Sequence, residues 1–241
     1  MISDNHLDVS LIIPAFNEEY AINKLIAQVD RVLQETTLKY ELILVDDGSQ
    51  DETLRKALIY SQNNSNLKVR GYAENRGKGY AIRKGFSLAR GDIIIILDSD
   101  LDIDPSQIKS YIRALKHGDL VIASKSHPQS VVSVPLLRRF LSYWFNLLVK
   151  LITGLKIQDT QTGLKAFRRK ELEPVFSVLT VHRFAFDVEL LTVANLHGLK
   201  IIELPLKIKL SNVIFHPLEI VKMFKDLLCI AFRLRVTHLY S

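Results

Sequence analysis

Cysteine is almost absent from this sequence of 241 residues, in which Cys229 is the only one. A single cysteine cannot form a disulfide within the chain, so a disulfide-stapled fold is excluded and a reducing compartment is favoured. Proline and glycine are also scarce, at 7 and 10 residues, which excludes a collagen-like chain. With 48% apolar and 24% charged residues, a chain of this length can bury enough surface to fold without disulfides or a structural metal.

Long apolar runs and several familiar site motifs are missing as well. The uncharged run of 10 residues from Phe140 to Val149 is about half of the roughly 20 that a membrane-spanning helix needs. The polar start, MISDNHLD, does not resemble a signal peptide. Lys78 is followed by Gly79 instead of Ser or Thr, which excludes a P-loop, and Ile82 breaks the dinucleotide fingerprint. The seven histidines show neither zinc-ligand spacing nor a Ser-His-Asp order.

Positive charge is concentrated in the second half of the chain. Residues 1–120 carry 15 Lys and Arg against 18 Asp and Glu, whereas residues 121–241 carry 17 against 8. The formal net charge of the whole chain is +6. This asymmetry suggests that the second half meets something anionic: nucleic acid, a phosphate or a lipid surface.

Strand and helix patterns alternate through the first half. Apolar runs with little alternation predict buried strands at 9–13, 41–45, 67–72, 92–97 and 119–123. Helical spacing predicts helices at 22–33, 51–63, 79–89 and from Pro105 onward. In the second half, helices are expected at 135–152, 184–197 and 217–234, with a late strand at 200–206. The pattern indicates a parallel sheet covered by helices on both faces, followed by amphipathic helices.

Polar residues follow four of the predicted strands at their carboxyl ends, where open α/β sheets bind ligands. The four segments are Pro14 to Glu19, Asp46 to Asp51, Glu74 to Gly79 and Asp98 to Asp102. The spacing of Asp98 and Asp100 lets two carboxylates face one hard divalent cation, which would also relieve their repulsion. The neighbouring basic loop around Lys78 suits a diphosphate.

Several motifs together point to one family. PAFNE, VDDGSQDET, ENRGKGYAIRKG and LDSDLD resemble the family 2 glycosyltransferases with the GT-A fold. Farther along, ASKSH, RRFLSYWFNLLV, DTQTGLKAFRR and HRFAFDVELL are similar to the polyprenyl-phosphate hexose synthases, with the dolichyl-phosphate β-glucosyltransferases as the nearest branch. The resemblance runs from about Val9 to Leu210. Departures from that branch are Lys125 for Arg, Leu164 for Phe and Phe184 for Trp, and an N-terminal membrane anchor is not expected.

The resemblance implies an architecture and a set of donor-site residues. We expect one GT-A domain over residues 1–241, with residues 1–125 binding the nucleotide sugar and residues 126–241 binding the acceptor. Implied nucleotide-sugar ligands are Pro14, Ala15, Asn17, Glu18, Asp46, Asp47, Lys78, Asp98 and Ser99. Asp98 and Asp100 are expected to be catalytic. Mg²⁺ or Mn²⁺, held by Asp100 and Asp102, would neutralise the departing diphosphate.

The basic second half would serve the acceptor. A lipid phosphate is ionised near neutral pH, so it needs a cationic cradle and alignment more than a general base. Candidate cradle residues are Lys125, Arg138, Ser142, Lys165 and Arg168. Asp159, also a candidate catalytic residue, would position the sugar or polarise the nucleophile, and capping of its own loop is the alternative.

The amphipathic helices predict peripheral attachment to the cytoplasmic face of a membrane. Their apolar faces would enter the headgroup region while Lys222, Arg233 and Arg235 meet anionic lipid. Packing of these faces in a homodimer is the alternative. Nucleic acid is not expected as a partner, because the predicted rim is acidic.

These features predict an inverting, metal-dependent transfer of a hexose to a polyprenyl or dolichyl phosphate, with glucose from UDP-glucose as the expected donor. GDP-mannose as donor and a glycan or protein hydroxyl as acceptor are alternatives within the same enzyme class. A hydroxyl acceptor would need a carboxylate base and would make Asp159 essential. An alternative of another class is a sugar-nucleotide-binding module without transfer activity.

Overall fold

The structure is a computed structural model that describes residues 6–133, 136–183, 185–209, 217–237 and 239–240. For Ser133, Tyr143, Lys209 and residues 136–141 and 217–221 it describes the backbone alone. The strands are β1 (Val9–Ala15), β2 (Tyr40–Asp46), β3 (Leu67–Gly71), β4 (Ile93–Leu97), β5 (Leu120–Ser124), β6 (Val131–Ser133), β7 (Leu164–Arg168), β8 (Ile201–Pro205) and β9 (Lys207–Lys209). The α-helices are α1 (Ile22–Gln34), α2 (Thr53–Ser61), α3 (Lys78–Leu88), α4 (Ile108–Ala114), α5 (Leu136–Thr153), α6 (Arg169–Val178), α7 (Phe186–Leu196) and α8 (Pro217–Phe232). A 3₁₀ turn, η1 (Pro105–Gln107), precedes α4, and a π-helical turn, η2 (Arg233–Thr237), follows α8.

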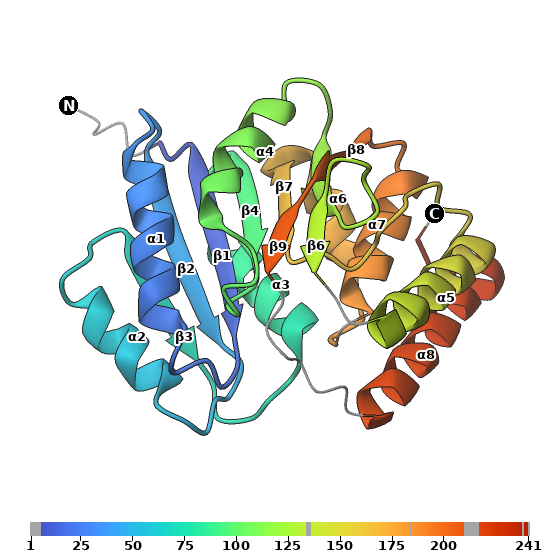
Figure 1. Ribbon diagram of the computed structural model, residues 1–241, viewed down its shortest axis with the longest axis horizontal. Helices are drawn as coiled ribbons and strands as arrows, with labels where there is room; N and C mark the ends of the chain where they lie inside the picture. Colours follow the sequence, from blue (N-terminus) through green and yellow to red (C-terminus); the bar gives the residue numbers. More distant parts are fainter. Residues whose placement is uncertain (1–5, 134–135, 184, 210–216, 238, 241) are drawn as a thin grey trace.

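Seven strands form one sheet in the order β3-β2-β1-β4-β7-β5-β8. All neighbours pair in parallel except β7, which is antiparallel to both β4 and β5. The predicted, mostly parallel α/β sheet is therefore confirmed, and strands from both halves of the chain share it (Figure 1). β6 and β9 form a separate two-stranded parallel ribbon.

The order in which successive strands are added to the sheet reverses between β1 and β4. From β1 the strand order runs outward through β2 and β3, whereas β4 begins the other half of the sheet. The carboxyl ends of these two neighbouring strands carry the segments that begin at Phe16 and Asp98. Such a switch point is where open α/β sheets bind ligands, because the connecting loops diverge there and leave space between them.

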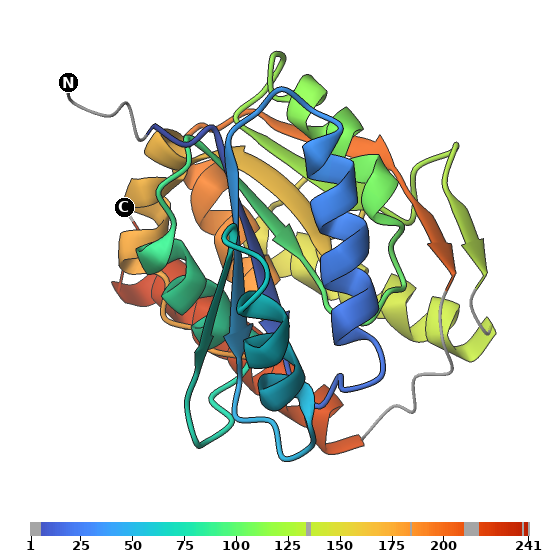
Figure 2. The ribbon, with the colours of Figure 1, turned by 90° about the vertical axis from the view of Figure 1, so that its left-hand side faces the viewer.

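Helices cover both faces of the sheet, as the apolar strand runs require. On one face, α1, α2 and α4 pack over a core that contains five side chains of α1 at helical spacing. These are Ile22, Leu25, Ile26, Val29 and Leu33. On the other face, α3 and α5 to α8 share a second core. Figure 2 shows α1 and α2 together in front of the strands.

The sequence did not predict β7, α6 or the β6-β9 ribbon. β7 is five residues long, and α6 begins at the next residue, Arg169, so no turn signal separates the strand from the helix. The ribbon strands are three residues each, too short to show a period. The elements that the sequence did predict are all present, with ends displaced by a few residues.

Each strand of the ribbon comes shortly before one of the two amphipathic helices in the sequence. β6 precedes α5 and β9 precedes α8 along the chain, and Figure 1 shows α5 and α8 side by side. The rings of Phe145 and Phe224 meet edge to face between them, with centroids 6.1 Å apart. Among the described residues, no helix has the length and apolar character that crossing a bilayer would require.

Candidate active site

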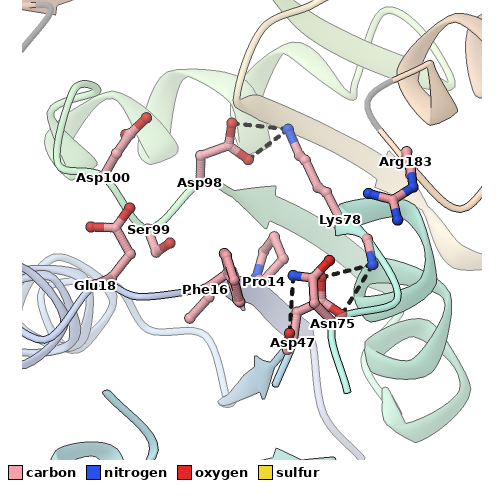
Figure 3. A pocket seen from close by; sticks show the side chains of 12 residues that line it. Pro14, Phe16, Glu18, Asp47, Asn75, Lys78, Asp98, Ser99, Asp100 and Arg183 are labelled. Atoms are coloured by element: carbon pink, nitrogen blue, oxygen red, sulfur yellow. Dashed lines mark hydrogen bonds and ion pairs between the residues drawn. The ribbon is translucent and has the colours of Figure 1, made fainter. Parts of the chain in front are cut away.

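A hollow of about 400 Å³ opens at the switch point of the sheet, and we call it the rim hollow (Figure 3). The residues that line it are Pro14, Ala15, Phe16, Glu18, Asp47, Asn75, Gly77, Lys78, Asp98, Ser99, Asp100 and Arg183. Eight of the donor-site and catalytic residues predicted from the sequence are in this set. They come from the end of β1, the loops after β1, β2 and β4, and the start of α3. Figure 3 shows Glu18, Ser99 and Asp100 toward one end and Lys78 and Arg183 toward the other.

Asn17 and Asp46, two further predicted donor ligands, do not line the rim hollow but hold its walls. The amide oxygen of Asn17 accepts a hydrogen bond from the Gln50 backbone N–H, and the Asn17 N–H donates to Ser49 Oγ. Asp46 Oδ2 accepts from the Ser49 N–H at 3.0 Å. These contacts join the loop after β1 to the loop after β2. That Asn17 and Asp46 contact the nucleoside stays a prediction, and in this structure both side chains hold the loops together.

The side chain of Asp47 is hydrogen-bonded to the segment that precedes α3. Its carboxylate accepts hydrogen bonds from Tyr72 Oη at 2.6 Å, Asn75 Nδ2 at 3.0 Å and the Gly77 N–H at 2.8 Å. The Arg76 N–H donates to it as well, at 2.9 Å. Its oxygens therefore fix the backbone that presents Lys78, and since Asp47 also lines the rim hollow, its role as an acceptor for the nucleoside stays a prediction.

Four charged side chains of alternating sign run from the rim hollow into the core, and we call them the charge chain. Lys78 Nζ lies 2.8 Å from Asp98 and 3.4 Å from Asp187 on α7. Lys165 Nζ on β7 lies 2.9 Å from the other oxygen of Asp187. Lys165 also donates to the Thr162 carbonyl. Each buried charge therefore has an opposite neighbour, which offsets the high cost of removing it from water.

The pKa values along the charge chain follow from this pairing. Burial alone would lower the pKa of Lys78, but Asp187 and Asp98 raise it above its ordinary value. Burial lowers the pKa of Lys165, with Asp187 acting in the opposite sense. Burial would raise the pKa of Asp187, and Lys165 and Lys78 reverse that effect. Lys78 therefore stays cationic at the floor of the rim hollow.

The acidic end of the rim hollow has an excess of negative charge. Desolvation, followed by Asp100 and other carboxylates, raises the pKa of Glu18 to about 7. The pKa of Asp100 rises to about 6 through desolvation of the carboxylate and the charge of Asp98. Carboxylates that repel one another in this way suit a hard divalent cation, whose preferred ligands are carboxylate oxygens.

A second hollow of about 80 Å³ borders the same carboxylates, and we call it the inner hollow. Asp98 and Asp100 line both hollows, whereas Asp102, Lys125, Gln161 and Thr162 line only the inner one of the two. Asp98 and Asp100 thus form a wall shared by two spaces. Asp102 is buried at this wall, and its N–H donates to Asp100 Oδ1 at 3.0 Å.

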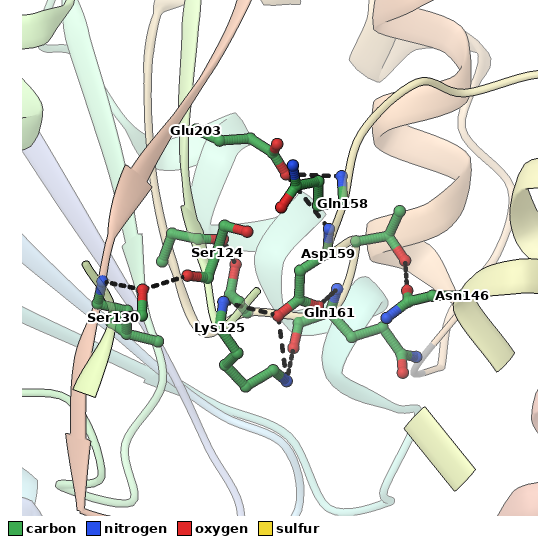
Figure 4. A network of polar contacts seen from close by, with 12 residues as sticks. Ser124, Lys125, Ser130, Asn146, Gln158, Asp159, Gln161 and Glu203 are labelled. Carbon is green, nitrogen blue, oxygen red and sulfur yellow. Dashed lines mark hydrogen bonds and ion pairs between the residues drawn. The ribbon is translucent and has the colours of Figure 1, made fainter. Parts of the chain in front are cut away.

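Lys125 and Asp159 are tied together beside the inner hollow (Figure 4). Lys125 Nζ lies 3.6 Å from Asp159 Oδ2 and donates to the Gln161 carbonyl at 2.9 Å. Asp159 Oδ2 also accepts from the Lys125 backbone N–H at 3.0 Å, and its Oδ1 accepts from the Gln161 N–H. On the same loop, Thr160 Oγ1 donates to Asn146 of α5 at 3.2 Å. Asp159 therefore caps its loop and orients Lys125.

The other predicted acceptor-phosphate residues do not join Lys125. Lys165 is 1% exposed and pairs inward with Asp187, so it supports the site from below. Arg168 pairs with Ile93 at the first residue of β4, the end of that strand away from Asp98. Its guanidinium donates to the Leu115 carbonyl. Because β7 runs antiparallel to β4, its last residue, Arg168, lies far from Asp98, whereas Lys165 lies opposite Ile96, near the end of β4 that precedes Asp98. The phosphate roles of these two residues stay predictions. Ser142 lies half-buried on α5 outside the described lining of either hollow, and the Arg138 side chain lies outside the described residues.

Arg183, Asn75 and Phe16 line the rim hollow without having been predicted. Arg183 stands in the HRFAFDVELL motif, which was noticed only through the resemblance, more than 80 residues along the chain from Asp98. Only the fold brings it beside Lys78.

The fold is the GT-A fold, and the family model gives the class of this protein, a glycosyltransferase, with its acidic and cationic hollow at the switch point of the sheet. The chain belongs to glycosyl transferase family 2, whose family model matches residues 10–176.

Relatives and solved structures agree with this assignment. The chain is 30% identical to the dolichyl-phosphate beta-glucosyltransferase of Dictyostelium discoideum over 95% of this chain and 75% of that protein. It is 33% identical to the dodecaprenyl-phosphate galacturonate synthase of Rhizobium johnstonii over 74% of this chain and 53% of that protein. Its fold matches glucosyl-3-phosphoglycerate synthase from Mycobacterium tuberculosis in complex with Mn²⁺ and UDP-glucose, with a TM-score of 0.70 at 21% identity. That match covers 94% of this chain and 78% of the solved one.

We predict that Asp187→Asn destabilises the protein by about 3 kcal/mol or more, because it leaves Lys165 as a buried charge with a weakened partner. Urea unfolding at neutral pH measures the change. The double variant Lys165→Met/Asp187→Leu should recover part of the loss, since it removes both charges together. A single variant as stable as the wild type would contradict this role of the charge chain.

Proposed function

We propose that this glycosyltransferase transfers glucose from UDP-glucose to the phosphate of a dolichyl or other polyprenyl lipid at a membrane surface. The observation that carries the proposal is the wall formed by Asp98 and Asp100 between the rim hollow and the inner hollow. A donor and an acceptor can meet at such a wall. Relatives that bear lipid-phosphate sugar transferase names match most of the chain, which supports the acceptor class.

The rim hollow is the proposed donor site. Lys78 and Arg183 supply positive charge for the diphosphate at one end. Lys78 already neutralises Asp98, so a diphosphate would compete for a lysine that is held in place and kept charged. Preorganised cations of this kind stabilise the negative charge that develops on the leaving group.

The acidic end fits a divalent ion such as Mg²⁺ or Mn²⁺. Asp100, with Asp98 or Asp102 beside it, provides carboxylate oxygens whose repulsion a cation would relieve. Within the described part of the chain, no three His, Cys, Asp or Glu side chains are grouped closely enough to hold an ion alone. One or two carboxylates with phosphate oxygens and water are the usual ligands of Mg²⁺ at nucleotide sites. When bound, the ion would act as a Lewis acid on the departing diphosphate.

The inner hollow is the proposed acceptor side. A lipid phosphate is already ionised near pH 7, so its oxygen can attack the anomeric carbon without a base. The new bond joins that oxygen to the anomeric carbon, the bond to the diphosphate breaks, and the electron pair leaves with UDP. Attack from the side opposite the leaving group inverts the anomeric centre. Lys125 would hold the phosphate, and Asp159 acts through Lys125 as a positioning residue.

An apolar stripe on α8 supports attachment to a membrane. Phe224, Leu228 and Phe232 recur every four residues and are 40%, 66% and 55% exposed. Lys222 and Lys225 are exposed on the same helix, where they can meet anionic headgroups. Trp144 and Leu151 add exposed apolar surface on α5, whose Asn146 contacts the loop of Asp159. A membrane against these helices would deliver a lipid phosphate near the inner hollow.

One residue of the predicted lipid contact is corrected. Arg233 was expected at the membrane, but its guanidinium turns inward to Glu189 and Thr180. Arg235 remains exposed and donates to the Leu151 and Ile152 carbonyls.

The direct test measures release of the nucleoside diphosphate, UDP from UDP-glucose or UDP-galacturonate and GDP from GDP-mannose, each with and without dolichyl phosphate and Mg²⁺. We expect release from UDP-glucose that depends on the lipid phosphate. Lys125→Gln should raise the apparent KM for the lipid about tenfold, because a charge-assisted contact is lost, while UDP affinity stays unchanged. Lys116→Gln, an exposed lysine after α4, is the matched control. Release that is indifferent to lipid phosphate would reject the proposed acceptor.

The metal assignment gives a second prediction. Asp100→Asn should lower turnover about 10²-fold, and chelation by EDTA should abolish it, if the ion supplies several kcal/mol to the transition state. Asp104→Asn lies on the same loop and outside the rim hollow, where its side chain accepts from the Ser106 N–H, a bond that asparagine can also make. Steady-state rates should therefore be normal in that control. Full turnover in EDTA would show that Asp100 serves another purpose.

Membrane attachment is tested by co-sedimentation with anionic liposomes. The wild type should sediment at low salt and be partly released at high salt, because headgroup attraction is screened. Leu228→Asp should remain mostly in the supernatant, whereas Leu58→Asp should behave as the wild type, since Leu58 is a similarly exposed leucine on α2. Recovery of the wild type in the supernatant as a dimer would favour a subunit interface instead.

A further inference from the structure

A fully buried carboxylate outside the charge chain accepts hydrogen bonds from two segments that are far apart in the sequence. Glu189 on α7 is 0% exposed. One of its oxygens accepts from the Thr180 and Val181 backbone N–H groups at 2.9 and 2.8 Å, and the other accepts from Thr180 Oγ1 at 2.9 Å. Glu189 therefore fixes the start of the loop at residues 180–183, which we call the arginine loop because it ends in Arg183.

The arginine loop packs directly on the turn that presents Lys78. A Cβ added at Gly77 would lie 2.5 Å from the His182 carbonyl oxygen, and one at Gly79 would lie 2.7 Å from the Val181 carbonyl oxygen. The Tyr80 N–H donates to the same His182 carbonyl at 3.1 Å. Because the two backbones touch without side chains between them, a shift of the arginine loop must also move Lys78. Both cations of the rim hollow therefore depend on this loop.

The last described residues of the chain hold the same carboxylate. Tyr240 is 3% exposed, and its hydroxyl donates to Glu189 at 2.5 Å. The Arg233 guanidinium, at the start of η2, lies 3.4 Å from the same Glu189 oxygen and donates to Thr180 Oγ1. Thus the segment that follows the exposed stripe of α8 is bonded to the base of the arginine loop.

The partly buried carboxyl of Asp226 on α8 is influenced by the same charges. Burial raises the pKa of Asp226; among the charges, Arg183 lowers it most, Glu189 raises it, and Arg233 lowers it.

We propose that Glu189, Arg233 and Tyr240 are positioning residues for diphosphate binding, so that Arg233 and Tyr240 set the affinity of the rim hollow by holding the arginine loop. This inference rests on the proposed donor site. The cluster would affect the binding of phosphate groups, since its hydrogen bonds hold the arginine loop, which carries Arg183 and packs on the turn that presents Lys78.

The test compares UDP and uridine affinities by calorimetry with the full chain and Mn²⁺. Tyr240→Phe keeps the buried ring and removes only the hydroxyl, and Arg233→Met removes only the charged bonds. Each should weaken UDP binding about threefold to tenfold, the range expected when one member of a shared network is lost, and leave uridine binding unchanged. A merely structural role would not separate the two ligands.

Ile230→Val is the matched control for stability, since Ile230 is fully buried on α8 and belongs to the same core as Tyr240. It should lower the unfolding midpoint by a few degrees, as Tyr240→Phe does, without changing UDP affinity. The inference is overturned if UDP affinity is unchanged in both network variants, if uridine affinity falls in parallel, or if Ile230→Val weakens UDP equally. A wild type that binds neither ligand would instead reject the proposed donor site.

Discussion

The alternating charges of Asp98, Lys78, Asp187 and Lys165 are the constraint on which the rest of the site depends. They come from the loop after β4 and from α3, α7 and β7, so this one chain of ion pairs joins both halves of the polypeptide. None of these charges could be buried alone, because the desolvation cost of an isolated ion exceeds the stability of most proteins. Each ion pair therefore fixes the position of the next side chain, and the charge chain ends at Asp98 in the wall between the two hollows.

Some polar residues of the site hold its loops in place, and others present carboxylates to the rim hollow. Asp47, Asn17, Asp46 and Asp159 each accept a hydrogen bond from a backbone N–H of a neighbouring loop, so they shape loops. Glu18 and Asp100 are left with carboxylates whose pKa values are raised by desolvation and mutual repulsion. A site with this division is preorganised, since its cations and carboxylates are in place before a ligand arrives.

The second half of the chain links that site to the outer surface. α5 reaches the Asp159 loop through Asn146, and the residues after α8 reach the arginine loop through Glu189. The same two helices carry exposed Trp144, Leu228 and Phe232 on their outer faces. Contacts at the surface and contacts at the hollows thus lie on the same elements, which favours an acceptor that is delivered from a membrane.

The sequence by itself determined the strands that carry the site, the loops at their carboxyl ends and the family. Buried runs such as DIIIIL have only one stable place in an α/β fold, and Asp98 and Asp100 must then stand at the sheet edge. It could not determine β7, whose five residues have no pattern apart from their pairing partners. The tertiary structure alone decided which charges face a ligand. The sequence predicted Lys165 and Arg168 as ligands of the acceptor phosphate and Arg233 as a lipid contact. Each turns inward instead, to an oxygen from a distant segment. Arg183 reaches the rim hollow only because its loop packs on two glycines more than 100 residues earlier. The reason is physical: a long flexible side chain takes its direction from partners that only folding brings within hydrogen-bond distance.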